Sequence, residues 1–418
     1  MKHWSRIIIV ALLLINRITC LPAPIWYQAS ELNQEPWFEQ PLLTSLTVKG
    51  RAAIVTRGFN AIGEKTTVFG IYGPDSIHYM AAGVPGIANQ PTNYLATLPT
   101  LQAVNNQFGA TLFNAELTIA NWSIELTQNL CHGFYLQLVA PFRRITVKNI
   151  SFCTNAHQTE VDPTIDWHAL SDLRNNLIPA IAAYGTYLCN NSVQHISDLQ
   201  CLLGWTRNDD SSYYLDFLDY SFITGIYAPT STQVNPAYPL QFSTGYNKHL
   251  SIPLMANVAC GLCDWITLHA YLGAIVITKK REPVGLMTAW RQQGIIRLAH
   301  SCAAVKPGTI VQFGGSCKAD HVIHGLSLLC GLGYDHQDPT RVYPCDASFD
   351  TALVNADPRF QSWSMVTLHL AGSYDYATVN NTRLPLITLS ADLPIHGTRI
   401  LKTDMLGAAL QLTISYCF

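Results

Sequence analysis

The sequence has few charged residues and lacks any long apolar run beyond its first 20 residues. Only 12% of the residues are Asp, Glu, Lys or Arg, about half the share usual in soluble proteins, whereas 49% are hydrophobic. A membrane-spanning helix needs about 20 consecutive, mostly apolar residues. The apolar residues are instead dispersed along the chain, which argues against a helical membrane protein.

Strong net charge and catalytic motifs are absent as well. The net charge of -2 excludes a strongly basic nucleic-acid binder. The chain contains no Gly-x-Ser-x-Gly, His-Glu-x-x-His or phosphate-binding glycine loop. Cys260-x-x-Cys263 has no second cysteine pair at the spacing of a zinc site. We therefore predict no enzyme activity, no cofactor and no metal, with a membrane-embedded hydrolase as a minor alternative.

The first residues have the organisation of an export signal. Lys2 and Arg6 precede an uninterrupted apolar run over residues 7–15, and small residues and prolines follow at 21–24. A basic start, a short apolar core and a change to small residues are typical of a secretory signal peptide. We therefore predict a signal peptide over residues 1–20 and an N-terminal lead-in over 21–43.

The last eleven residues alternate strictly between apolar and polar or small side chains. Period two is typical of a strand with one apolar face. In a closed membrane barrel such a last strand pairs with the first, and its apolar face contacts lipid. These residues resemble the terminal strand of bacterial outer-membrane β-barrels, which commonly ends in Phe and in that family is recognised by the assembly machinery. The positions that carry the resemblance are Leu410, Leu412, Ile414, Tyr416 and Phe418.

The same alternation recurs along most of the chain. We expect the first strands near 44–58 and 65–73 and the last near 404–418. In residues 113–127 the apolar positions change phase, which we interpret as a β-bulge. The odd apolar positions there are Phe113, Ala115, Leu117 and Ile119, and the even ones are Trp122, Ile124 and Leu126.

Together these patterns predict an all-β protein. The expected fold is a closed antiparallel transmembrane β-barrel over residues 44–418, with about 12 strands within a range of about 10–14. Long insertions are expected at about 74–108, 154–201 and 279–294, and one short loop helix near 166–184, where the apolar residues have a helical period.

A barrel of this width favours a narrow or partly plugged channel. The resemblance implies an outer-membrane channel for passive passage or uptake of small solutes. It also implies contacts with outer-membrane lipid and lipopolysaccharide and with the barrel assembly machinery, and many porins form homo-oligomers. A surface or adhesive barrel is an alternative within the same class. The inward phases of the strands give the candidate lumen-lining residues Glu116, Glu125, Gln137, His269 and His369.

A second hypothesis comes from a different class of protein. Four sites match the N-glycosylation pattern, at Asn121, Asn149, Asn190 and Asn380. With a signal peptide and 12 cysteines, the chain is compatible with a secreted, disulfide-bonded β-sandwich glycoprotein. Loop cysteines such as Cys153, Cys189 and Cys201 are then candidates for pairing, although the sequence does not give the connectivity.

Overall fold

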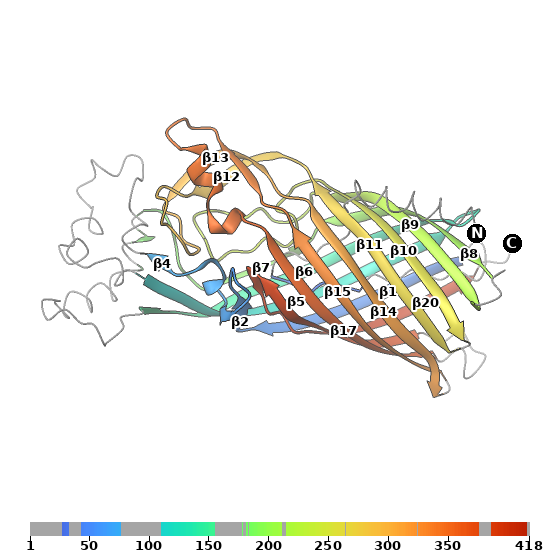
Figure 1. Ribbon diagram of the computed structural model, residues 1–418. Helices are drawn as coiled ribbons and strands as arrows, with labels where there is room; N and C mark the ends of the chain where they lie inside the picture. Colours follow the sequence, from blue (N-terminus) through green and yellow to red (C-terminus); the bar gives the residue numbers. More distant parts are fainter. Residues whose placement is uncertain are drawn as a thin grey trace, which may run out of the picture.

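The computed structural model describes residues 27–32, 43–76, 110–154, 178, 181–182, 184–210, 215–263, 265–323, 325–375 and 386–415. Within these residues, 12 antiparallel strands form a closed barrel (Figure 1). The strands are β1 (Leu43–Val55), β5 (Ala110–Asn129), β6 (Phe134–Thr154), β8 (Leu199–Asp209), β9 (Phe217–Ala228), β10 (Ser251–Cys263), β11 (Ile266–Ile277), β14 (Ile310–Ile323), β15 (Leu326–Gln337), β17 (Trp363–Asp375), β18 (Leu386–Thr398) and β20 (Met405–Ser415).

The barrel closes between its first and last strands. β1 pairs with β20 on one side and with β5 on the other, and Leu46 lies opposite Leu412 in the β1–β20 register. Closure removes the exposed edges that would promote aggregation. The predicted fold class and strand number are therefore confirmed, and the β-sandwich alternative is wrong. The ends of the predicted terminal strand, Tyr416 and Phe418, lie outside the described residues.

The outer wall of the barrel is apolar. Val48, Trp122 and Leu412 are among many large hydrophobic side chains that barrel strands expose, with exposed fractions of 42%, 65% and 41%. A soluble monomer rarely exposes a contiguous apolar surface larger than a few hundred Å². Alternation in β1 turns the neighbouring Thr47 and Lys49 toward the interior, where Thr47 is buried. The barrel therefore has an apolar outside and a partly polar inside.

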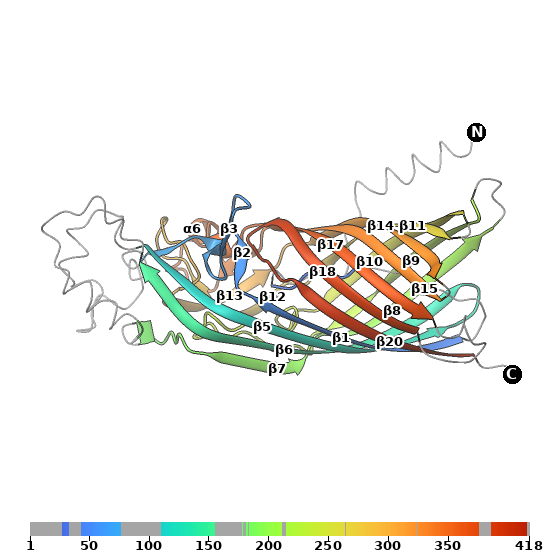
Figure 2. The same ribbon diagram turned by 90° about the horizontal axis from the view of Figure 1, so that it is seen from below.

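Long connections gather at one end of the barrel, which we call the loop end (Figure 2). They carry a sheet of β12 (Lys280–Leu286), β13 (Ala299–Lys306) and β16 (Arg341–Pro344), and the helix α6 (Thr351–Asn355). A second small sheet contains β2 (Arg57–Phe59), β3 (Lys65–Thr67) and β19 (Ile400–Leu401). Two short strands extend the barrel sheet, β4 (Asp75–Ser76) beside β5 and β7 (Asn191–Ile196) beside β6. None of the described helices is long and apolar enough to cross a membrane.

The structure corrects two of the expected elements. The barrel strand expected at 65–73 is instead β3 followed by the 3-10 helix η1 (Gly70–Tyr72), because Phe69 and Ile71 are buried in a cluster at the loop end. The polar loop expected at 279–294 contains β12. The helix expected near 166–184 lies largely outside the described residues.

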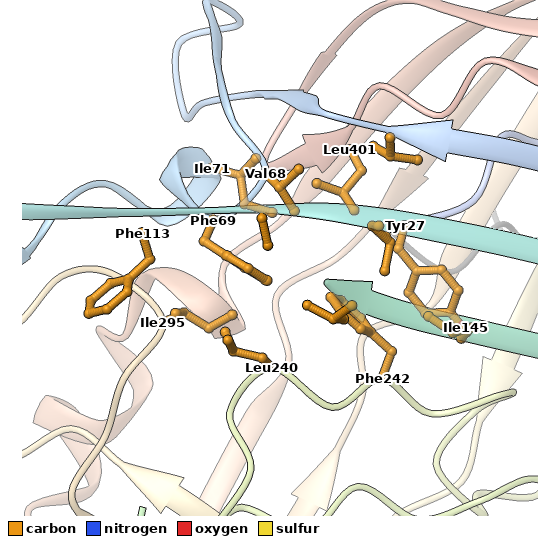
Figure 3. Close-up of a cluster of buried hydrophobic side chains, with 14 of the residues drawn as sticks. Tyr27, Val68, Phe69, Ile71, Phe113, Ile145, Leu240, Phe242, Ile295 and Leu401 are labelled. Atoms are coloured by element: carbon orange, nitrogen blue, oxygen red, sulfur yellow. The ribbon is translucent and has the colours of Figure 1, made fainter. Parts of the chain in front are cut away.

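The phase change in β5 is not a bulge. The β5–β1 register runs without interruption from Leu117 to Gln128. Phe113 and Leu117 point inward into a buried cluster with Phe242 and Ile295 from the loops (Figure 3), whereas Trp122 on the other face points outward. The apolar face of β5 is therefore the inner face in the half nearer the loop end and the outer face in the other half. A bulge does occur closer to the loop end, between β5 and β6, where Asn149 has a φ of 55°.

A buried carboxylate fixes two loops to each other at the loop end. Asp75 accepts hydrogen bonds from the backbone N–H groups of Ile295 and Ile296, at 3.2 and 2.9 Å. Burial raises the pKa of Asp75 to about 7, although these hydrogen bonds and the nearby Arg297 oppose that rise. Gly294 has a φ of 78°, and a Cβ there would lie 2.1 Å from the Asp75 carboxyl carbon, so only glycine fits.

Candidate functional site in the barrel interior

A short piece of the N-terminal chain lies inside the barrel. Residues 27–32, which we call the internal segment, are buried from Tyr27 to Ser30. Tyr27 packs in the loop-end cluster with Phe242, their ring centroids 5.4 Å apart. Leu32 packs against a second cluster that includes Tyr135 and Met365 from the barrel strands. The segment therefore connects the two hydrophobic clusters of the interior.

Ion pairs fasten the internal segment to the barrel wall. Arg51 of β1 contacts the carboxylate of Glu31 at 3.0 Å and that of Asp392 of β18 at 2.7 Å. Asp392 also lies 2.8 Å from Nδ1 of His369 on β17. The Arg51 guanidinium holds the pKa of Glu31 below its ordinary value. We call Glu31, Arg51, Asp392 and His369 the latch.

A second ion pair lines the interior beside the latch. Lys49 of β1 contacts Glu125 of β5 at 2.8 Å, and Gln137 of β6 donates a hydrogen bond to the same carboxylate. The Glu125 side chain is 15% exposed and that of Lys49 is 35% exposed. Partly solvated charges of both signs are what a polar path for small solutes would present.

The loop-end side of the internal segment is held by hydrogen bonds. The Tyr27 hydroxyl donates to the carbonyl of Ser243 and accepts from Nη1 of Arg143, at 3.1 Å in the second case. Thr403 donates to the Tyr27 carbonyl at 2.8 Å. Because these partners come from different connections and from β6, this anchor and the latch hold the segment at both ends.

The structure separates the predicted lumen residues into two groups. Glu125, Gln137, His269 and His369 point inward, and His269 stacks with Tyr271 at a centroid distance of 6.1 Å. Glu116 lies on the outer face of β5, because its neighbours Ala115 and Leu117 are buried inside. The interpretation of Glu116 as lumen-lining is therefore wrong. The error arose because the sequence pattern was taken to place the apolar residues of this half of β5 on the outer face.

The charged residues that matter most for this site were not among the residues predicted from the sequence. Lys49 and Arg51 lie on the face of β1 opposite to Leu46 and Val48, so their phase in the sequence could have identified them as inward. Glu31 lies outside any strand and carries no such signal. Its role depends on the path of the internal segment through the barrel.

The histidine of the latch resembles one part of a hydrolase site. In such sites a carboxylate orients the histidine, whose other nitrogen lies within hydrogen-bond reach of a nucleophile. Asp392 orients His369, but Nε2 of His369 has no hydrogen-bond partner among the described residues. Asp392 is also engaged by Arg51. Within the described part of the chain, the arrangement therefore shows no nucleophile hydrogen-bonded to His369, and it matches an electrostatic tether better.

Comparison with solved structures supports the fold. The chain is similar to an outer membrane channel from Pseudomonas putida, with a TM-score of 0.53 and 10% identity over 92% of this chain and 100% of that one. Weaker likenesses include the β domain of the Bordetella autotransporter Brka (TM-score 0.37, 7% identity, 89% of this chain and 99% of that one). The Pseudomonas putida toluene transporter TodX is also similar (TM-score 0.33, 9% identity, 91% of this chain and 90% of that one).

At these identities the likeness to the channel defines the fold alone. No protein-family model matches the sequence. No curated protein matches it either. The class defined by fold and site is therefore a closed 12-stranded β-barrel with an apolar outer wall and an internal segment held by ion pairs.

Proposed function

We propose that the protein is an outer-membrane channel for passive passage or uptake of small solutes, closed at rest by its internal segment. The observation that carries the proposal is the latch: a barrel with an apolar outside holds a segment inside through Arg51, Glu31 and Asp392. Ion pairs with a partly exposed partner are weak enough to break and re-form. A segment held in this way is suited to opening and closing a path.

The outer wall supports the membrane location. A band of exposed Leu, Ile, Val, Phe and Trp side chains on a closed barrel matches the lipid-facing surface of outer-membrane barrels. The export signal expected at residues 1–20 is consistent with this location. Lipid and lipopolysaccharide around the wall, and recognition of the terminal strand by the assembly machinery, are part of the proposal.

Planar-bilayer conductance tests the channel directly. Purified, detergent-refolded protein is added to the bilayer, and heat-modifiable migration in gels shows beforehand that the barrel is folded. We expect discrete conductance steps. Each opening should be brief because the internal segment is held at both ends. The proposal would be contradicted if the folded wild-type protein gave no conductance steps and a variant without the contact between Arg51 and Glu31 gave none either.

The filled loop end favours a second candidate. The inner faces of β5 and β6 pack there against Phe242, Ile295 and other loop residues (Figure 3), so this end of the interior is occupied by protein. A barrel that serves as a surface or adhesive protein would need no path at all. This candidate would be supported if intact cells bound a surface, if deletion of the gene abolished that binding, and if latch variants left it unchanged.

A further inference from the structure

Two cysteines face each other in the small sheet that covers the loop end. Ala303 of β13 pairs with Pro344 of β16, so the antiparallel register continues to Cys302 and Cys345. The backbone N–H of Cys345 donates to the carbonyl of Cys302 at 2.9 Å. Both side chains are exposed to solvent. A side-chain hydrogen bond with Cys345 raises the pKa of the Cys302 thiol.

The backbone geometry suits a covalent bond between these residues. Residues directly opposite in an antiparallel pair have Cα atoms about 4.5–5.5 Å apart, and disulfides usually join residues whose Cα atoms are about 4.4–6.8 Å apart. The Cα separation typical of this register therefore falls within the range that a disulfide spans. The pair was not among the candidates from sequence, because 42 residues separate its members and the register of β13 and β16 alone brings them together.

We propose that Cys302 and Cys345 form a disulfide that ties β13 to β16. The two thiols lose two protons and two electrons as the S–S bond forms, and a disulfide oxidant, either a protein or oxidised glutathione, is reduced to two thiols. The inference rests on the proposed function in one respect, because an outer-membrane location exposes this sheet to an oxidising compartment.

Another opposed pair shows why solvent exposure matters. Cys317 of β14 and Cys330 of β15 are also register partners, but they point outward from the barrel wall. They line a shallow groove of about 660 Å³ with apolar neighbours such as Leu370 and Leu389. A thiolate is the attacking species in disulfide exchange, and apolar surroundings disfavour it. The pair in the loop-end sheet is therefore the one that we expect to oxidise.

The bond would fasten the cover of the loop end. It would enclose residues 303–344, which include the whole β14–β15 hairpin. The inner face of the β12–β13–β16 sheet buries Val305 and Val342 against Val354 of α6. A disulfide between β13 and β16 would restrain this cluster and the connections beside the internal segment. It would act mainly by limiting the freedom of the unfolded chain.

Mapping of thiols in the wild-type chain tests the proposal. Folded, full-length protein is incubated with oxidised glutathione, free thiols are blocked with N-ethylmaleimide, and the digest is analysed by mass spectrometry. We expect a peptide linked through Cys302 and Cys345 that disappears after reduction with dithiothreitol. Alkylation or glutathionylation of both cysteines with no peptide that joins them, or linkage of either one to a different cysteine, would overturn the proposal.

Matched variants test the disulfide between Cys302 and Cys345. Protein taken from the cell envelope tests the proposed location. Cys302→Ser should leave Cys345 alkylated or glutathionylated and absent from any linked peptide, whereas Cys317→Ser should retain the peptide linked through Cys302 and Cys345. Protein taken from the cell envelope, with thiols blocked at lysis, should carry the same link. A pair that oxidises in glutathione but is reduced in the envelope supports the geometry and contradicts the proposed outer-membrane location. Failure in glutathione overturns the disulfide and leaves the channel proposal unaffected.

Discussion

The guanidinium of Arg51 on the barrel wall lies 3.0 Å from the carboxylate of Glu31 on the internal segment. Glu31 is 50% exposed at its side chain and Arg51 is 12% exposed. Arg51 also contacts Asp392, so one cation serves both the wall and the segment. Removing the carboxylate of Glu31 therefore releases the latch end of the segment without leaving a charge unpaired on the wall.

Glu31→Gln should increase the open probability of the channel in planar bilayers. A half-exposed ion pair contributes about 1 kcal/mol at most, which corresponds to a roughly fivefold shift between closed and open states. The matched control is Glu64→Gln, which removes a carboxylate from an exposed turn at the loop end, where the Glu64 side chain accepts a hydrogen bond from Asn60. An equal open probability in wild-type protein and Glu31→Gln would mean that the latch does not control opening of the channel.

Arg51→Leu should destabilise the folded barrel by about 3 kcal/mol, because Asp392 then keeps a buried charge without its cation. The double variant Arg51→Leu with Asp392→Leu should be less destabilised than the single variant, since no unpaired charge remains. Urea unfolding in lipid vesicles, followed by tryptophan fluorescence, measures both free energies of unfolding. A double variant less stable than Arg51→Leu would contradict the ion pair as the source of the effect.

The barrel was predictable from the sequence because a strand between lipid and a polar interior must alternate with period two. The pairing of β1 with β20 follows from this rule, and Leu46 and Leu412 share the outer face. The rule fails in β5, where Phe113 and Leu117 pack inside against loop residues while Trp122 points outward. Periodicity shows which residues share a face but does not show what that face contacts.

The site was less predictable than the wall. Glu125 and Gln137 lie on neighbouring strands, and their inward phase could be inferred from local alternation. The latch joins Glu31 to Asp392, residues far apart in the sequence, through a segment with no regular structure. No local pattern encodes such a contact. It depends on where the internal segment lies inside the closed barrel.

Leu412→Arg should cost about 2–4 kcal/mol in free energy of unfolding if its position lies near the bilayer midplane, and less near an interface. Leu412 is 41% exposed on the outer wall, whereas its neighbour Gln411 faces inward and donates to Ser45 at 3.0 Å. Gln411→Arg is therefore the matched control, and it should lose about 1 kcal/mol for that hydrogen bond. Equal losses at the two positions, measured by urea unfolding in lipid vesicles, would contradict the outward register of β20.

Asp75 should make the barrel more stable in mild acid than in mild base. Its folded pKa of about 7 lies above the value of about 4 expected for an unfolded Asp. The folded state therefore binds more protons between these values, and the free energy of unfolding falls as the pH rises from about 4 to 7, by up to about 4 kcal/mol. Asp75→Asn can still accept a hydrogen bond but cannot titrate, so the fall should be absent in urea unfolding between pH 5 and 8. An identical pH slope in wild-type protein and Asp75→Asn would show that Asp75 is ionised in the folded state at low pH, with the N–H groups of Ile295 and Ile296 outweighing its burial.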